Sequence, residues 1–160
     1  MGYWLVVLGE VDGLRWVMAN RRMAFTAVRQ SLATKIQLGD RLIVYVGRGA
    51  YHNPTRDRSQ IIGVATVRTR VRGLRMPLKI GGREFVCDCG LKIDIALPER
   101  NGVPIQPLIR KLSFVKRPEV WGQYFRSSLA PLSTSDFRLL ENAVMKCSRG
   151  LARHGVGFDD

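Results

Sequence analysis

The segment from Leu112 to Ser133, LSFVKRPEVWGQYFRSSLAPLS, places flat rings next to positive charges. Its aromatic residues are Phe114, Trp121, Tyr124 and Phe125, and its cations are Lys116, Arg117 and Arg126. A ring can stack on a nucleobase and a guanidinium can bind a phosphate, so the combination suits a nucleic acid. The rings could equally form a core wall, and Trp121 fits either role. Arg126, between an aromatic residue and two serines, is the stronger functional candidate.

A sustained basic stretch occupies the middle of the chain. The residues predicted to contact phosphates are Arg48, Arg56, Arg58, Arg68, Arg70 and Arg72. Arginine suits this task because its planar guanidinium can bind a phosphate through two hydrogen bonds. If residues 61–72 (IIGVATVRTRVR) form one strand, the last three arginines share one face, because side chains alternate along a strand. A solvated loop would have a similar composition.

Three more aromatic residues are candidates for stacking on a base: Trp16, Tyr45 and Tyr51. Any one of them could instead belong to the core. Tyr51 differs from the others, because it lies beside Asn53 in a long polar loop between two apolar runs. Long loops of this kind often carry function.

The sequence contains none of the common catalytic motifs. G-x-S-x-G, G-x-x-x-x-G-K and G-x-G-x-x-G are all missing, and GRG at 47–49 is a weak phosphate loop. His52 and His154 are the only histidines, and the three cysteines lack paired Cys-x-x-Cys spacing. We therefore expect no catalysis, no cofactor and no bound metal.

Length and composition favour one domain with a basic surface. The chain has 160 residues, 46% of them hydrophobic, which is enough for a single core. We expect the domain to cover residues 1–148 and a flexible tail to cover 149–160. The formal net charge of +13 favours a polyanionic partner. The three cysteines form no even disulfide framework, so we predict a protein of the reducing cytoplasm. No targeting segment or membrane-length apolar run is seen, so we expect no membrane contact. A monomer is favoured, with the oligomeric state left open.

Apolar patterns predict the elements that position these side chains. Strands are expected at 3–9, 41–46 and 61–72, and a half-exposed strand at 84–99. A turn is expected at EVDG (10–13), followed by a helix over 18–32 with Asn20 as its N-cap. A last helix should start after Ser133, with Leu132 packed on Phe137, and end at Gly150. Without a regular βαβ alternation, this order predicts an α+β fold.

Taken together, these blocks resemble the EVE domain, a member of the PUA-like superfamily. YWLVV, LGDRLIVYV and IIGVATV occur in the family's order, followed by the more specific IQPLIRKLSFVKRPEVWGQYFRSSLAPLSTSDFRLLENAV. The resemblance covers residues 3 to 144 and is greatest to the short prokaryotic branch. It implies a PUA-like, largely antiparallel β pseudo-barrel flanked by short helices. It also implies a pocket for a modified base extruded from DNA or RNA.

The resemblance assigns residues to that pocket. The matching positions are Trp16 after the first strand, Asn20 and Arg21 before the first helix, Tyr45 at a strand end, and the late Trp121 and Arg126. Gly47 and Tyr51 complete the expected pocket. Many relatives have a His-Ser pair where this chain has Val46 and Gly47, and a Pro-containing turn where it has EVDG. These departures leave the recognised modification open.

Three functions are compatible with the sequence. The first is a non-catalytic module that binds a modified cytosine or adenine in DNA, or a modified RNA base. The second, implied by the superfamily, is a small amidohydrolase of acylated nucleosides, with Thr34, Lys35 and Glu10 as nucleophile, activator and acid/base. Thr34 and Lys35 also fit a solvated turn. The third is a small-molecule or protein-interaction module whose charge is incidental.

Overall fold

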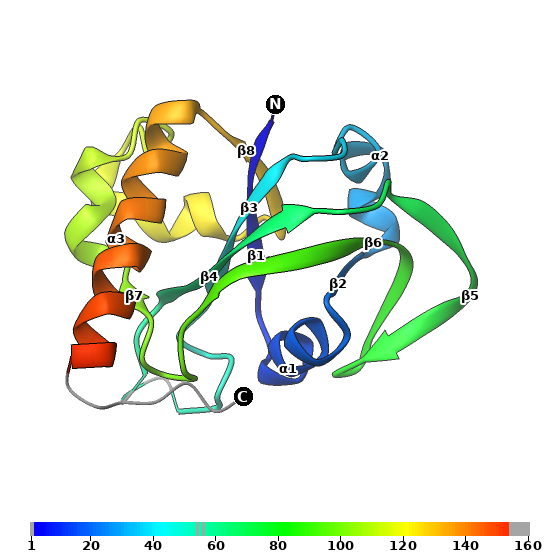
Figure 1. Cartoon of the computed structure of the whole chain (residues 1–160), viewed down its shortest axis with the longest axis horizontal. Coiled ribbons are helices and arrows are strands. Elements are labelled where there is room, and N and C mark those ends of the chain that lie inside the picture. Colours follow the sequence, from blue (N-terminus) through cyan, green and yellow to red (C-terminus); the bar gives the residue numbers. More distant parts are fainter. Residues whose placement is uncertain (1, 54, 56, 154–160) are drawn as a thin grey trace.

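The chain forms a curled sheet with helices along its sides (Figure 1). The computed structural model describes residues 2–53, 55 and 57–153. Within them the strands are β1 (Tyr3–Leu8), β2 (Arg22–Phe25), β3 (Arg41–Val46), β4 (Gln60–Val67), β5 (Arg72–Ile80), β6 (Arg83–Ala96), β7 (Val103–Pro104) and β8 (Leu129–Leu132). The α-helices are α1 (Val11–Asn20), α2 (Gln30–Ala33) and α3 (Thr134–Arg153), and the 3-10 helices are η1 (Ala27–Arg29), η2 (Gln106–Lys111) and η3 (Pro118–Phe125). None of the described helices is long and apolar enough to span a membrane.

The sheet is built around a parallel pair of strands. Its order is β2-β6-β4-β3-β1-β8, with β5 attached to β6 and β7 attached to β4. The strands β1 and β3 run parallel from Tyr3↔Arg41 to Leu8↔Val46, and the other pairs are antiparallel. Because parallel neighbours end at the same edge of a sheet, Gly9 and Gly47 leave the two strands side by side.

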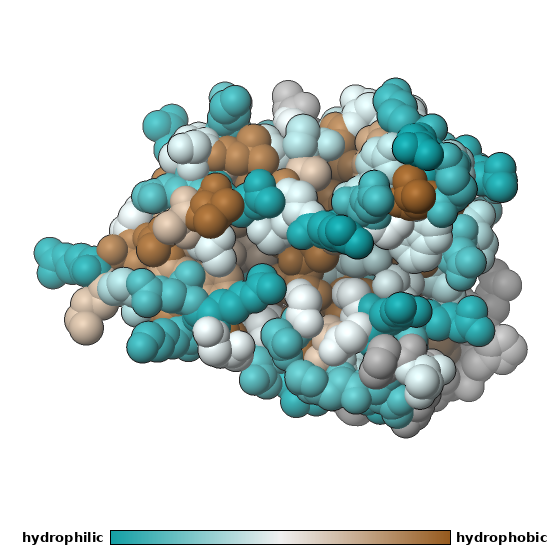
Figure 2. Space-filling model, turned by 180° about the vertical axis from the view of Figure 1, so that it is seen from behind, coloured by the Kyte–Doolittle hydropathy of each residue, from teal (hydrophilic) through white to brown (hydrophobic). Residues whose placement is uncertain are grey.

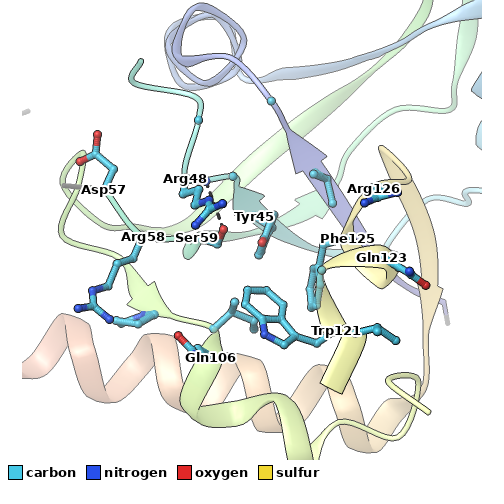
Figure 3. A pocket seen from close by; sticks show the side chains of 18 of the residues that line it. Tyr45, Arg48, Asp57, Arg58, Ser59, Gln106, Trp121, Gln123, Phe125 and Arg126 are labelled. Carbon is cyan, nitrogen blue, oxygen red and sulfur yellow. Dashed lines mark hydrogen bonds between the residues drawn. The ribbon is translucent and has the colours of Figure 1, made fainter. Parts of the chain in front are cut away.

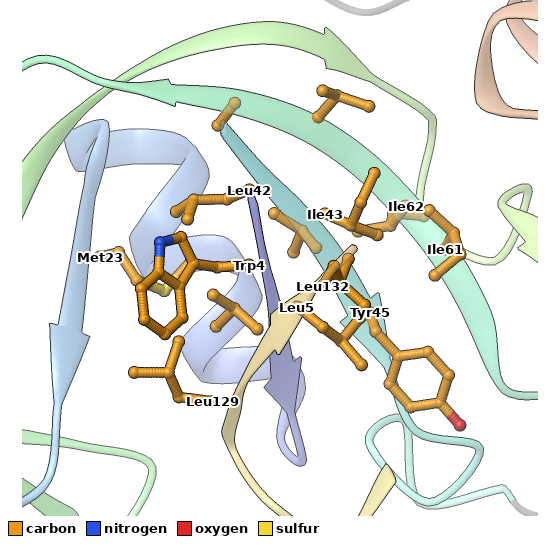
Figure 4. Close-up of a cluster of buried hydrophobic side chains, with 14 of the residues drawn as sticks. Trp4, Leu5, Met23, Leu42, Ile43, Tyr45, Ile61, Ile62, Leu129 and Leu132 are labelled. Carbon is orange, nitrogen blue, oxygen red and sulfur yellow. The ribbon is translucent and has the colours of Figure 1, made fainter. Parts of the chain in front are cut away.

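The core lies on these central strands, which are apolar on both faces as buried strands are. Figure 4 shows Leu5, Leu42, Ile43 and Ile61 within it, all fully buried. Tyr45 lies at one end of this cluster, and its hydroxyl points away from the aliphatic side chains. The predicted strands at 3–9 and 41–46 are therefore confirmed, with β1 ending one residue early.

The last helix begins where the sequence predicts. The Asp136 N–H donates to the Ser133 Oγ over 3.1 Å, which is the N-cap bond. Phe137, Leu140 and Val144 are fully buried against the sheet. The predicted end at Gly150 is wrong, because α3 continues to Arg153 and Leu151 packs against the core. The rest of the predicted tail, 154–160, lies outside the described residues.

The predicted helix over 18–32 is wrong as one element, because this segment contains the end of α1, then β2, and then the short helices η1 and α2. The residues EVDG, expected as a turn, instead begin α1, with Glu10 as the N-cap and Val11 as the first helical residue. Asn20 is the last residue of that helix instead of an N-cap. The next residues form β2, in which Met23 and Phe25 are buried and pair with β6. Apolar residues two apart fit a strand with one buried face, so the sheet decides this segment against the helical pattern.

The predicted third strand is two separate strands. β4 ends at Val67, and the chain then bends through residues 68–71 before β5 begins at Arg72. Beyond the bend, β5 pairs with the half of β6 that β4 leaves uncovered. Arg68, Arg70 and Arg72 are exposed as predicted, but they do not share the face of one strand. The predicted strand at 84–99 corresponds to β6, with Leu91 buried and Lys92 exposed.

Candidate nucleic-acid interface

A wide groove opens at the edge of the sheet where β1 and β3 end and β4 begins. Its volume is about 1230 Å³. Val7, Gly9, Tyr45 and Gly47 line it from the strand ends, and η2 and η3 contribute the opposite wall. Pockets for single small ligands usually have volumes of roughly 300 to 1000 Å³. The groove therefore has room for a base together with part of its strand.

Three aromatic rings form one wall of the groove (Figure 3). Tyr45 from β3 stacks on Phe125 from η3, with ring centroids 4.7 Å apart and planes 21° from parallel. Trp121 meets Phe125 edge to face at 5.9 Å. On its other side, Phe125 contacts the Phe114 ring at 5.5 Å. The buried Phe125 thus contacts both of the other rings in the wall, Tyr45 and Trp121.

The strand geometry aims Tyr45 at this site. The register between β3 and β4 shifts between Val44 and Tyr45, so that Ile62 is skipped in the pairing. Such bulges bend a strand and re-aim a side chain, and they are common beside binding sites. Burial raises the pKa of the Tyr45 phenol, so the hydroxyl stays protonated at neutral pH. It is a neutral hydrogen-bonding group in the wall of the groove.

Four arginines border the groove, namely Arg48, Arg58, Arg83 and Arg126. Among the described residues none of the four forms an ion pair. The groove also contains two acidic residues, Asp57 and Glu119. Each already has an arginine partner outside the lining: Asp57 lies 3.3 Å from Arg100, and Glu119 lies 3.1 Å from Arg117. The lining arginines therefore leave net positive charge facing the groove.

Neutral polar groups complete the lining. Ser59, Gln106 and Gln123 border the groove, and Figure 3 shows Arg48 and Arg58 on the side away from η3. The Arg48 N–H donates to the Ser59 Oγ over 3.2 Å, which fixes the loop that enters β4. Side-chain amides and hydroxyls can each donate and accept, as the edge of a base requires.

Gly47 leaves the groove open at the end of β3. A Cβ atom placed there would meet no other atom within 4 Å, so glycine is not needed for close packing. Its effect is to expose the backbone to the groove. Of the eight residues predicted for a base pocket, four line this groove: Tyr45, Gly47, Trp121 and Arg126.

Trp16, Asn20 and Arg21 lie elsewhere, on the second half of α1 and at its end. The Asn20 Nδ2 donates to the Trp16 carbonyl over 2.9 Å, and the Arg21 N–H donates to the Val17 carbonyl over 2.8 Å. Arg21 adopts the left-handed conformation, with φ 52°, that commonly closes a helix. Arg22 covers the Trp16 ring, 5.6 Å from its centroid. These residues thus have structural contacts of their own.

Tyr51 is near the groove but does not line it. Its ring is half-buried beneath the guanidinium of Arg100, 4.9 Å away.

The predicted phosphate contacts divide into two groups. Arg48 and Arg58 border the groove, whereas Arg68, Arg70 and Arg72 lie beyond the opposite end of β4. The eight residues of β4 span about 26 Å at roughly 3.3 Å per residue. Arg56 lies outside the described residues.

The sequence did not predict several of the lining residues. Ser59, Gln106 and Gln123 are isolated polar residues without a motif, and only the folded sheet brings them together. Phe125 was visible as one ring of the aromatic segment, but its stacking on Tyr45 was not. Arg83 reaches the groove from the tip of the β5–β6 hairpin, and the two glycines before it, Gly81 and Gly82, were the available signal.

The residues considered for an amidohydrolase do not share this site. The Thr34 Oγ1 donates to the Ser31 carbonyl over 2.7 Å, and neither Thr34 nor Lys35 lines the groove. Glu10 instead lies 3.1 Å from His52. Within the described part of the chain, no three His, Cys, Asp or Glu residues are placed to hold a metal ion.

Comparison with solved structures identifies the fold. No family model and no curated protein matches the sequence. The YTH domain of Mmi1 aligns with a TM-score of 0.60 at 7% identity, over 96% of this chain and 99% of that one. The Pho92 YTH domain in complex with m6A aligns with a TM-score of 0.60 at 9% identity, over 89% and 82%.

A bacterial protein is similar as well. Rpa0253 from Rhodopseudomonas palustris aligns with a TM-score of 0.56 at 19% identity, over 91% of this chain and 94% of its own. These identities are low, so the likeness concerns the fold. The predicted α+β class with a largely antiparallel, curled sheet is confirmed, and the chain has the fold found in YTH domains.

Proposed function

We propose that this protein is a non-catalytic nucleic-acid-binding module that holds a modified base in the groove at the ends of β1 and β3. The observation that carries the proposal is the wall of Tyr45, Phe125 and Trp121 beside arginines that have no carboxylate partner among the described residues. We further infer that the chain belongs to the EVE branch that its sequence resembles.

The lining offers a separate group for each part of a nucleotide. A base that leaves its strand can stack on Trp121, as bases commonly stack on aromatic side chains. Ser59, Gln106 and the Tyr45 hydroxyl lie along the same groove and can bind the edge of the base. Arg48 and Arg126 can bind the flanking phosphates.

The structural neighbours support this proposal. Mmi1 is represented by a YTH domain in complex with RNA, and Pho92 by one in complex with m6A. Binding RNA or m6A involves no chemical reaction. The binding proposed here likewise uses only stacking, hydrogen bonds and charge. We therefore take RNA carrying m6A as the first probe, with DNA and methylated cytosine as the next.

The test measures binding of oligonucleotides that differ only in one base modification. Fluorescence anisotropy with RNA and DNA strands, each with adenine, m6A, cytosine or 5-methylcytosine at the centre, gives a preference ratio for every pair. We expect at least one modified strand to bind more tightly than its unmodified partner. Trp121→Ala should lose about 1 to 3 kcal/mol of binding free energy, the usual contribution of one stacked base.

Two further variants make the test specific to the groove. Gly47→Val adds a side chain to open space, so it should keep the fold and reduce the preference ratio. Trp16→Phe alters a ring outside the groove and should leave the ratio unchanged. Equal affinity of the wild type for all modified and unmodified strands would refute base recognition, and no binding to any strand would refute the whole proposal.

A further inference from the structure

The second exposed feature of the molecule is the edge strand β5. Residues 68–83, RTRVRGLRMPLKIGGR, contain six cations and no acidic residue. Of these cations, Arg72, Arg75 and Lys79 lie on β5, and Arg83 is the first residue of β6. We call these four residues the basic strip. Among the described strands only β6 pairs with β5, so the outer edge of β5 carries no strand.

The basic strip leads directly away from the groove. Gly81 and Gly82 have φ values of 56° and 78°, and two such residues form the tight turn that suits a hairpin. This turn places Arg83 opposite Ile80 and at the groove, which Arg83 lines. The ends of β5 pair with β6 at Ile80↔Arg83 and Arg72↔Asp88, so they are separated by five residue steps of β6, about 17 Å at roughly 3.4 Å each.

The strip is also free to bind. Pairing with β6 is interrupted between Gly73 and Leu78, so the middle of β5 stands away from the sheet. Leu74 and Leu78 are half-buried, whereas Arg75 and Lys79 are exposed. Figure 2 shows this side of the molecule at its left, where hydrophilic side chains surround a few hydrophobic ones. No ion pair joins any strip residue to another described residue.

Edge strands often carry charge for a different reason. Charged side chains and proline prevent an exposed edge from pairing with another molecule, and β5 contains Pro77. That protection works with charge of either sign. A run that is cationic without exception and is continuous with a cationic groove instead fits a partner with regularly spaced negative charges.

We infer that the basic strip binds the backbone of the same nucleic-acid strand whose base enters the groove. The inference rests on the proposed function and adds the path of the strand. A helical strand advances about 3.4 Å per nucleotide, so about 17 Å corresponds to roughly five nucleotides. Because the strip leaves the groove in one direction, only one side of the strand should lie on it.

The experiment compares strands of different lengths. Four RNAs each carry one m6A. The first has three flanking nucleotides on both sides, the second has six more on the 5′ side, the third has six more on the 3′ side, and the fourth has both extensions. Wild-type protein should gain at least tenfold in affinity from one extension and little from the other. The variant Arg72→Gln/Arg75→Gln/Lys79→Gln should lose that gain. Its salt dependence should fall by a slope of about 2, at roughly 0.7 per phosphate contact on a single strand.

A matched control removes the same charge elsewhere. Arg138, Lys146 and Arg149 are exposed on α3, on the opposite side of the molecule from β5 in Figure 1, and their triple Gln variant should keep the gain. The variant Arg72→Glu/Arg75→Glu/Lys79→Glu keeps a charged edge, so it should have the same oligomeric state as the wild type and still lose the gain.

The possible outcomes separate the two proposals. An unchanged length gain in the Gln or Glu strip variants would overturn the inference while leaving the groove proposal intact. A wild-type gain that is equal for the two extensions would also overturn it. If the wild type binds none of the four RNAs and none of the corresponding DNAs, the proposed function itself fails.

Discussion

Arginines near the two ends of β3 have opposite surroundings. Beneath α3, Arg41 contacts Glu141, lies 3.3 Å from Asp94 and covers the Phe137 ring at 5.1 Å. Its side chain is only 25% exposed. At the groove, Arg48 and Arg126 are exposed, and no described carboxylate pairs with either.

The difference shows how the role of an arginine can be recognised. A guanidinium between two carboxylates has its charge already compensated, and it joins the elements that carry them, here α3, β3 and β6. A guanidinium whose neighbouring acids are paired with other residues has charge left for a ligand. Replacing the arginine that is paired with carboxylates should therefore lower the stability of the fold. Replacing an unpaired arginine at the groove should instead weaken nucleic-acid binding.

The largest effect is expected from Asp136, which connects the two regions. Its buried carboxylate accepts hydrogen bonds from the Ser113 N–H at 2.8 Å, the Ser113 Oγ at 2.7 Å and the Phe114 N–H at 3.2 Å. Asp136→Ala should lower the free energy of unfolding by about 3 kcal/mol, because it leaves these donors unpaired. Phe114 supports Phe125, so the preference for a modified base should fall as well.

Urea denaturation and anisotropy on the same preparations measure both effects. Asp136→Asn keeps one acceptor oxygen and should cost roughly half as much stability. If Asp136→Ala lowers stability by less than about 1 kcal/mol, the hydrogen bonds to segment 113–114 do not hold the wall of the groove.

The second effect tests the compensated arginine alone. Arg41→Met keeps much of the aliphatic volume but leaves Asp94 and Glu141 without their cation, so we expect a loss of about 2 kcal/mol in stability. Thermal unfolding should show a lower midpoint. Nucleic-acid affinity, measured where both proteins are folded, should remain within twofold of wild type. A clear loss of affinity would mean that Arg41 does not have a purely structural role.

The sequence predicted the central strands and the start of the last helix better than it predicted the groove. The strands YWLVVL and RLIVYV and the N-cap Ser133 were predictable, because an apolar run between turn residues and a hydroxyl before a helix are local signals. The residues that resemble a family pocket were less predictable. Trp16 and Asn20 precede β2 in sequence, but α1 carries them along the molecule, away from the groove.

The groove itself depends on contacts between distant segments. Tyr45 and Phe125 are far apart in the chain and meet only because η3 packs over the end of β3. Arg83 reaches the groove only through the hairpin turn of Gly81 and Gly82. Single-sequence patterns report the period of an element and its caps, and they contain little information on such long-range pairs. Arg126 could be predicted as a binding residue, because its neighbours in the sequence, an aromatic residue and two serines, offer it no ion pair.

The third effect tests the uncompensated arginine. Arg126→Met should change the free energy of unfolding by less than about 0.5 kcal/mol, as exposed substitutions usually do. It should weaken binding about tenfold, since a charge-assisted contact to a phosphate is lost. Raising the salt concentration should reduce the difference in nucleic-acid affinity between variant and wild type, because salt weakens a contact that only the wild type makes. A variant that binds as wild type does would remove Arg126 from the interface.

The smallest effect concerns Asp40, a buried charge that is held by N–H groups. Its carboxylate accepts from the Gly2 N–H at 2.8 Å, the Trp4 Nε1 at 3.0 Å and the Gln37 N–H at 2.9 Å. Burial alone would raise the pKa of Asp40, but the donors from Gln37, Trp4 and Gly2 outweigh it and lower the pKa.

The sign of that shift sets the expected pH dependence. A carboxylate with a lowered pKa in the folded state adds stability above its ordinary pKa of about 3.9, and this contribution is lost as the pH falls through the lowered value. Asp40→Asn should therefore be less stable than wild type at pH 6, and the gap should narrow towards pH 3 in urea titrations. If the difference in stability between wild type and Asp40→Asn stays constant over this pH range, the lowered pKa of Asp40 is contradicted. Nucleic-acid binding at pH 6 to 8 should not change with pH in either protein, because arginines keep their charge there and this pH lies far above the range in which Asp40 titrates.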